Sequence, residues 1–216
     1  MISFATLAQE KDTVKIKPDF RPTGLRVGTD LISIVRSSTD KTFTGWEANA
    51  DIDFYRYYFT VDYGSWGRSY SSDTNSYSNT GNYFRVGVDV NFLKKDPDRN
   101  MFFFGFRYGV GTFSEDLMVV RTSEIWGPLT ENFSNNNVSA NWFELTTGLR
   151  VKIWKVIWLG YTARLKFGLS TGATPDMMPH DVPGYGRAEE DSYWGFNYQI
   201  FIRLPVRKSG AIPLKK

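Results

Sequence analysis

The chain has 216 residues, no cysteine and a formal net charge of +3, and these features exclude several classes of protein. Without cysteine there is no disulfide framework, no thiol nucleophile and no thiolate metal site. The charge is too small, and the basic residues too scattered, to indicate nucleic-acid binding. Aromatic residues make up 17% of the chain, yet its mean hydropathy is -0.36 and no run of about 18 apolar residues could cross a bilayer as a helix. Any membrane span must therefore be made of strands.

The two ends of the chain differ from its middle. Residues 1–8 form a short apolar run that ends in a small residue, which is typical of the end of a secretory signal peptide, although no basic segment precedes it and an ordinary N-terminal extension is the alternative. Residues 9–21 are polar and are expected to form an extended periplasmic tether. Residues 207–216 are a basic tail without periodicity. Residues 22–206 are left for a single folded domain.

In that domain, eight segments alternate polar and apolar residues with the two-residue period of a β-strand. In chain order they cover residues 25–36, 46–54, 57–66, 83–92, 102–111, 143–153, 157–167 and 197–204. The fourth and fifth segments form the clearest hairpin, with a turn at 94–100 between them. Its apolar face carries Phe84, Val86, Val88, Phe102, Phe104 and Phe106.

The connections between these segments alternate between short and long. Short turns lie at 55–56, 94–100 and 154–155, whereas longer, polar connections cover 37–43, 69–81, 113–137 and 170–191. Tight turns at one rim, long loops at the other and an even number of strands are the pattern of a bacterial outer-membrane barrel. The sequence therefore predicts an all-β fold, an eight-stranded antiparallel up-and-down transmembrane β-barrel with short periplasmic turns and long extracellular loops.

Glycine indicates which face of the strands points inward. Gly28, Gly64, Gly105 and Gly148 all lie on the polar face, beside arginines. Glycine weakens a strand unless a large group must fit beside it, and the interior of an eight-stranded barrel is only just wide enough to be filled by side chains. The polar face is therefore predicted to be the lumen, where buried charges need partners. The predicted luminal charges are Arg26, Glu47, Asp51, Asp53, Asp62, Arg85, Asp89, Arg107, Glu144, Arg150 and Arg164.

With that assignment the apolar face, including the six hairpin residues named above, is expected to contact lipid, and the filled lumen predicts no diffusion pore. The reverse assignment would give a soluble lipocalin-like carrier, with the apolar face around a ligand cavity. Aromatic residues gather toward the strand ends on the apolar face, where membrane barrels place their interfacial girdles. Strands favour aromatic residues in any case, so this feature supports the membrane assignment less strongly.

Several sequence stretches resemble the small outer-membrane β-barrel proteins of the Bacteroidota that are often described only as a domain of unknown function. They are PTGLRVGTDLISI from Pro22, GWEANADIDFYRYYFTVDYG from Gly45, YFRVGVDVNFLKKDPDRNMFFFGFRYG from Tyr83, WFELTTGLRVKIWK from Trp142, LGYTARLKF from Leu159 and DVPGYGRAEEDSYWGFNYQIFIRLP from Asp181. The resemblance covers residues 22–205 and implies the outer membrane, a single barrel and no established enzymatic activity. It offers no catalytic residues. Phe201 is followed by four further residues and a basic tail, which departs from barrels that end on an aromatic residue.

Few residues suggest a chemical site. His180, the only histidine, is followed by Asp181 in a loop expected at the extracellular rim, and the pair could serve an enzyme that modifies lipid or peptide. A loop histidine without a role is the more ordinary interpretation. One histidine and scattered carboxylates do not define a metal site. Glu115 with Asp116, and residues 189–191, could bind Ca²⁺ in long loops, although such acids are usually only solvated.

From these features we expect no catalytic residue and no cofactor. The expected function is a non-enzymatic outer-membrane barrel, an accessory or structural subunit of a larger envelope complex for protein insertion, secretion or uptake. Its expected partners are outer-membrane lipid and other outer-membrane proteins, not nucleic acid. The alternative is a barrel enzyme at the outer leaflet that uses His180.

Overall fold

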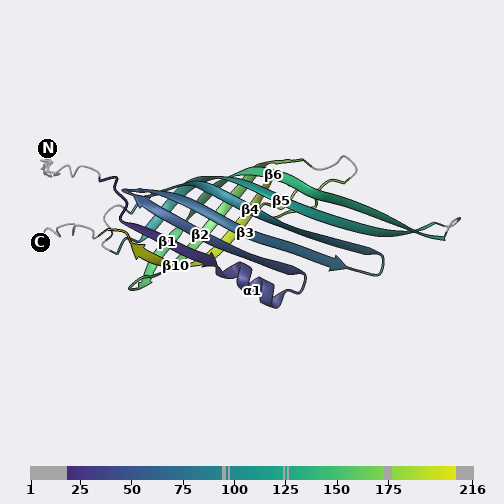
Figure 1. Cartoon of the computed structure of the whole chain (residues 1–216), viewed down its shortest axis with the longest axis horizontal. Helices are drawn as coiled ribbons and strands as arrows, with labels where there is room; N and C mark the ends of the chain where they lie inside the picture. Colours follow the sequence, from purple (N-terminus) through teal and green to yellow (C-terminus); the bar gives the residue numbers. More distant parts are fainter. Residues whose placement is uncertain are drawn as a thin grey trace, which may run out of the picture.

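The computed structural model describes residues 19–93, 96, 98–123, 125, 127–172 and 177–207, and these form a closed antiparallel barrel. Its strand order is β1-β10-β7-β6-β5-β4-β3-β2, so that each strand pairs with its neighbour along the chain and β1 closes the ring on β10 (Figure 1). The wall strands are β1 Gly24–Asp30, β2 Phe43–Phe54, β3 Tyr57–Ser71, β4 Asn75–Asn91, β5 Met101–Ser123, β6 Gly127–Trp154, β7 Ile157–Thr171 and β10 Ser192–Pro205. The predicted eight-stranded up-and-down barrel is confirmed.

The short turns lie together at one end of the barrel, which we call the short-turn end. Two-residue turns join β2 to β3 and β6 to β7, and Tyr55 and Lys155 within them have positive φ angles of 63° and 24°. The wall closes at this end with the pair Gly24 and Pro205, the first residue of β1 and the last of β10. The predicted signal remnant at 1–8, residues 9–18 of the tether and residues 208–216 of the tail lie outside the described residues.

The first strand is shorter than predicted. Residues 25–36 were expected to be extended, but the strand ends at Asp30 and Leu31–Thr39 forms the helix α1. The Asp30 carboxylate accepts a hydrogen bond from the backbone N–H of Ser33 at 3.0 Å, which is an N-cap, and another from the N–H of Tyr198 on β10 at 3.0 Å. The cap starts α1. The same carboxylate also binds the backbone N–H of Tyr198 on β10, which a longer β1 would have paired.

Helix α1 lies beside a gap in the barrel wall. β1 pairs with β10 only up to Gln199 and with β2 only up to Ala48, so the long-loop halves of β2 and β10 have no strand between them. α1 contacts both strands at this gap and lies outside the wall (Figure 1). Ser37 satisfies part of the free edge of β2. Its hydroxyl donates to the C=O of Gly45 and accepts from the N–H of Gly45, both at 2.7 Å. The wall is thus incomplete on one side.

Two of the predicted long loops are mostly strand. The β3–β4 ladder continues to Ser71 and Ser76, and the β5–β6 ladder continues through a bulge near Phe113 to Ser123 and Gly127. The prediction that residues 69–81 and 113–137 form loops is therefore wrong, because most of these residues are in paired strands. Most of their outward residues are polar, so the alternation of polarity stops while the backbone ladder goes on. The β5–β6 hairpin projects farthest from the barrel (Figure 1).

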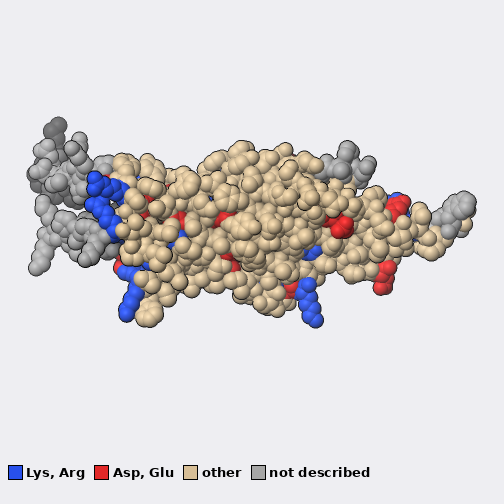
Figure 2. Space-filling model, viewed as in Figure 1, with Lys and Arg blue, Asp and Glu red and all other residues tan. Residues whose placement is uncertain are grey.

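The outside of the barrel is apolar around its middle. Phe84, Val88 and Phe102 are 37–41% exposed, Phe104 and Phe106 about half exposed, and Val86 is half-buried. On the side of the barrel drawn in Figure 2, few charged atoms lie over the middle, and basic side chains gather at the short-turn end. We call this zone of outward apolar side chains the outer band. No helix among the described residues has the length and apolarity to span a membrane.

Candidate functional site

A network of ion pairs fills the lumen, and its short-turn half links strands from opposite sides. Arg26 on β1 donates to Asp51 on β2 at 2.8 Å, and Arg150 on β6 donates to the other oxygen of Asp51, also at 2.8 Å. The second terminal nitrogen of Arg150 lies 3.0 Å from Asp89 on β4. These side chains are at most 3% exposed. Because β6 does not neighbour β2 or β4, these contacts cross the barrel interior.

The long-loop half of the network continues from the same strands. Arg107 on β5 lies 3.1 Å from Asp89 and also pairs with Asp62 on β3. Arg164 on β7 then joins Asp62 at 3.3 Å to Glu144 on β6 at 3.0 Å. All of these groups are at most 2% exposed. The chain of ion pairs therefore runs without a break through the middle of the barrel.

The network ends at Glu47 on β2 and Arg85 on β4, which pair with each other. Glu47 also lies 3.5 Å from Arg164, and Arg85 lies 3.6 Å from Glu144. We call the ten residues the luminal network: Arg26, Glu47, Asp51, Asp62, Arg85, Asp89, Arg107, Glu144, Arg150 and Arg164. Five are arginines and five are carboxylates, so the network is formally neutral. This balance lets so many charges be buried together, since each has a partner.

Aromatic side chains fill the rest of the lumen. Arg26 lies 4.7 Å from the ring centre of Tyr58, and Arg150 lies 4.8 Å from that of Phe103. Trp142 is fully buried, and its indole N–H donates to Glu144 at 2.8 Å. A Cβ atom at Gly109 on β5 would overlap that indole, so this glycine is required by a close approach. The lumen is thus filled with charged and aromatic side chains and is packed like a core.

The described part of the connection between β7 and β10, residues 177–191, folds inward and covers the long-loop end of the lumen. Its two short strands, β8 Asp181–Val182 and β9 Gly186–Arg187, form a small hairpin. Val182 and Tyr185 are fully buried and pack in an apolar cluster that includes Trp142. Lys166 on β7 donates to the backbone oxygen of Tyr185 at 2.7 Å. We call residues 181–187 the plug, because they close the barrel on this side.

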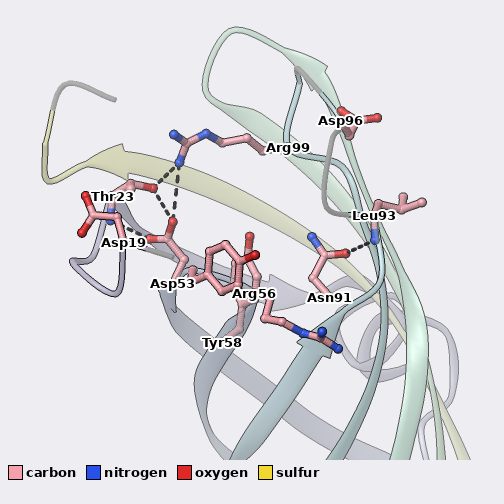
Figure 3. Close-up of a pocket in the computed structure, with 10 residues that line it drawn as sticks. Asp19, Thr23, Asp53, Arg56, Tyr58, Asn91, Leu93, Asp96 and Arg99 are labelled. Atoms are coloured by element: carbon pink, nitrogen blue, oxygen red, sulfur yellow. Dashed lines mark hydrogen bonds and ion pairs between the residues drawn. The ribbon is translucent and has the colours of Figure 1, made fainter. Parts of the chain in front are cut away.

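The short-turn mouth holds a shallow cavity of about 190 Å³ (Figure 3). Asp53, which the sequence placed in the luminal network, lies here instead and organises the chain before β1. Its carboxylate accepts from the backbone N–H of Thr23 at 2.9 Å and from that of Gly24 at 2.6 Å. Arg99 and Arg203 lie 3.5 and 3.8 Å from it. The cavity is thus held by contacts that fix the entry of the chain into the barrel wall.

The rim pair suggested by the sequence is not assembled as a catalytic pair. The imidazole of His180 is exposed and packs edge to face on Tyr77, with ring centres 5.6 Å apart. Asp181 is buried, and its carboxylate lies 3.3 Å from Arg68 on β3. Adjacent residues thus point toward different partners, and Asp181 holds the plug to the wall.

The predicted calcium ligands are also apart. Glu115 is fully buried and accepts hydrogen bonds from Tyr77 at 3.1 Å and Asn135 at 2.8 Å, whereas Asp116 is exposed. Successive residues of a strand point to opposite faces, so the two carboxylates cannot share a cation. Residues 189–191 are exposed. Within the described ranges, no group of three or more acidic or histidine side chains is arranged to hold a metal ion.

The family of the chain follows from its sequence. A family model described as a domain of unknown function, DUF6048, matches residues 1–209. The chain belongs to the DUF6048 family. No curated protein sequence matches this DUF6048 chain. A solved structure, Acinetobacter baumannii CarO2, is similar with 14% identity and a TM-score of 0.41, and the match covers 85% of this chain and 98% of that one.

Sequence reasoning missed two features of this DUF6048 barrel. The first is the aromatic packing of the lumen, although Phe103, Trp158 and Phe201 could be placed on the polar face by the same alternation. The second is the gap beside α1. Its signal is the spacing of Leu31, Ile32 and Val35, which suits one face of a helix better than a strand.

Proposed function

We propose that this protein is an integral barrel of the bacterial outer membrane that neither conducts solutes nor catalyses a reaction, and that it serves as an accessory subunit of a larger envelope complex. The observation that carries the proposal is the distribution of charge. The lumen holds a neutral network in which each charged group has an ion-pair partner, while the outer band is apolar. This arrangement suits a wall in lipid, because a soluble barrel would expose the charges and bury the apolar face.

The extended β5–β6 hairpin is the surface best placed to contact a partner. It continues beyond the outer band, and Met118 and Leu129 on it are 39% and 55% exposed. Paired backbone keeps the hairpin in one conformation, which lowers the entropic cost of binding. A partner seated there would leave the barrel wall in contact with lipid.

A pull-down from native outer membranes tests the proposal. The protein, tagged after Lys216, is extracted in mild detergent and its companions are quantified. We expect a reproducible partner at a near-equimolar ratio. A matched variant shortens the hairpin by joining β5 to β6 with a two-residue turn just beyond the pair Leu117 and Phe133, so that Glu115 keeps its contacts. It should keep the barrel and lose the partner.

Two results would contradict this proposal. Recovery of folded protein from the periplasm without detergent would favour the soluble carrier. A barrel that comes out alone from repeated mild extractions, while remaining in the outer-membrane fraction, would remove the role as a subunit but not the membrane location.

A further inference from the structure

A cavity of about 200 Å³ lies at the gap between β2 and β10. Its lining includes Glu47 and Lys166, which face inward, and Ile32, Trp194 and Phe196, which face outward. The cavity is thus lined by side chains from both faces of the wall. We call it the lateral cavity. It opens on the long-loop side of the outer band, beside α1.

Basic side chains dominate the charged lining of the lateral cavity. Arg36, Arg68, Arg85 and Lys166 face two carboxylates, Asp30 and Glu47, which gives the lining a formal charge of +2. Asp40 and Asp181, just outside the lining, pair with Arg36 and Arg68, so the excess belongs to the lining and not to the whole region. Asp30 is also turned to the backbone, where it caps α1. The lining therefore offers several cationic hydrogen-bond donors to an anion.

The unpartnered polar atoms of the lateral cavity are all donors. Among the described residues, the indole N–H of Trp66 and the Nε–H groups of Arg68 and Arg85 are buried without a hydrogen-bond acceptor. Arg85 is only 2% exposed. Buried donors without acceptors are costly, so an occupant that supplies several acceptor oxygens would stabilise this wall. Planar guanidinium groups suit the oxygens of a phosphate in particular.

An apolar groove adjoins the lateral cavity on the outside of the barrel. It has a volume of about 340 Å³ and runs between α1 and Tyr198 of β10. Leu31 and Val35 line it, and Ile32 and Arg36 line both the groove and the cavity. The groove faces the same side as the outer band. An apolar groove that leads directly into a basic cavity matches a molecule with an acyl chain and an anionic head.

We propose that the lateral cavity binds the phosphate head of a membrane lipid whose acyl chain lies in the groove beside α1. Arg36 and Arg68 are placed at its entrance, since their side chains are 40% and 15% exposed, and Lys166 lies deeper. The proposal rests on the membrane location given above but goes beyond the role as a subunit. Its test uses the purified protein without a partner, so the two can fail separately.

The test is native mass spectrometry of the full chain released from detergent containing equal amounts of phosphatidic acid and the matching diacylglycerol. We expect retention of phosphatidic acid, and affinity weaker by about tenfold in the variant Arg36→Gln, because one charge-assisted hydrogen bond is lost while the contact between Arg68 and Asp181 stays intact. The matched control is Arg121→Gln, which removes the same charge from an exposed ion pair outside the site. It should bind like the unchanged protein.

Further arms of the experiment separate the sources of phosphate. Val35→Asn, in the groove, should weaken binding of phosphatidic acid without loss of the barrel, which is checked by the different gel mobilities of folded and heated protein. Inorganic phosphate, at the same concentration, should bind far more weakly than the lipid. Equal retention of diacylglycerol, equal binding of inorganic phosphate, or an equal loss in the control variant would overturn the proposal.

Discussion

Arg150 on β6 and Asp51 on β2 form an ion pair of 2.8 Å across the lumen, although 99 residues separate them along the chain. Both side chains are 2% exposed. Removal of one partner would leave a buried charge without its counterpart, which is more costly than removal of both. The pair joins opposite sides of the wall, so it can form only when the barrel has closed.

The first prediction concerns this pair. Arg150→Met should lower the free energy of unfolding by about 3 to 5 kcal/mol, because the Asp51 carboxylate loses a partner in a buried site. The double variant Asp51→Leu/Arg150→Met should lose less than the sum of the single variants. Urea unfolding in lipid vesicles, followed by gel mobility, measures both.

Lys152→Met is the matched control for this prediction, because Lys152 is two residues along the same face of β6 and pairs with exposed Asp98. Its cost should stay within about 1 kcal/mol. Equal losses for Arg150→Met and Lys152→Met would contradict the importance of the luminal network.

The second prediction tests which face of β5 points inward. Gly109→Ile should prevent the barrel from forming, since even a Cβ atom at this position would overlap Trp142. Val110→Ile adds one methylene at the next residue, which is 39% exposed, and should be tolerated. The fraction of protein that refolds into vesicles gives the answer, and the opposite ranking would reverse the inward and outward faces.

The residue alternation predicts the fold because the lumen and the outside of the barrel carry side chains of opposite polarity on the two faces of each strand. It predicted the inward arginines and carboxylates but placed Asp53 in the network, whereas this residue binds the chain before β1. The extensions of β3 to β6 could not be predicted, since beyond the outer band both faces tolerate polar residues. α1 was missed because one N-cap, Asp30, outweighs a short alternating pattern.

Tyr77 supports a third prediction, on pH. It lies on β4 beyond the outer band, and burial of its hydroxyl, followed by the nearby Glu115 carboxylate, raises its pKa well above the ordinary value. The unfolded chain therefore releases this proton first as pH rises past about 10, and the folded state loses stability there. Tyr77→Phe should flatten that loss.

The measurement for Tyr77 is the urea midpoint in vesicles between pH 8 and 11. At the lower pH, Tyr77→Phe should cost about 1 kcal/mol, because its hydrogen bonds to Glu115 and the N–H of Asp181 disappear. Tyr70→Phe removes a hydroxyl from a ring that is 40% exposed on β3 and serves as the control. A steeper loss above pH 10 in Tyr77→Phe would contradict the argument.

The fourth prediction concerns His180 and the enzyme alternative. His180→Ala should leave the lipid composition of the outer membrane unchanged and alter stability by no more than about 0.5 kcal/mol, since the imidazole is exposed. Asp181→Asn should destabilise the barrel, because it breaks the contact with Arg68 that holds the plug. A changed lipid profile in His180→Ala, with normal folding, would establish the enzyme instead.

The last prediction tests the membrane location through one strand. Phe106→Arg, in the outer band, should reduce the free energy of insertion into vesicles by about 2 to 4 kcal/mol, because an outward arginine near the bilayer midplane must be buried in lipid. Met118→Arg makes a similar change on the same strand beyond the band, and it should cost about 0 to 1 kcal/mol. Folding titrations in vesicles against urea compare the two. Similar small costs at both positions would mean that the outer band does not face lipid, and the proposed membrane location would then be wrong.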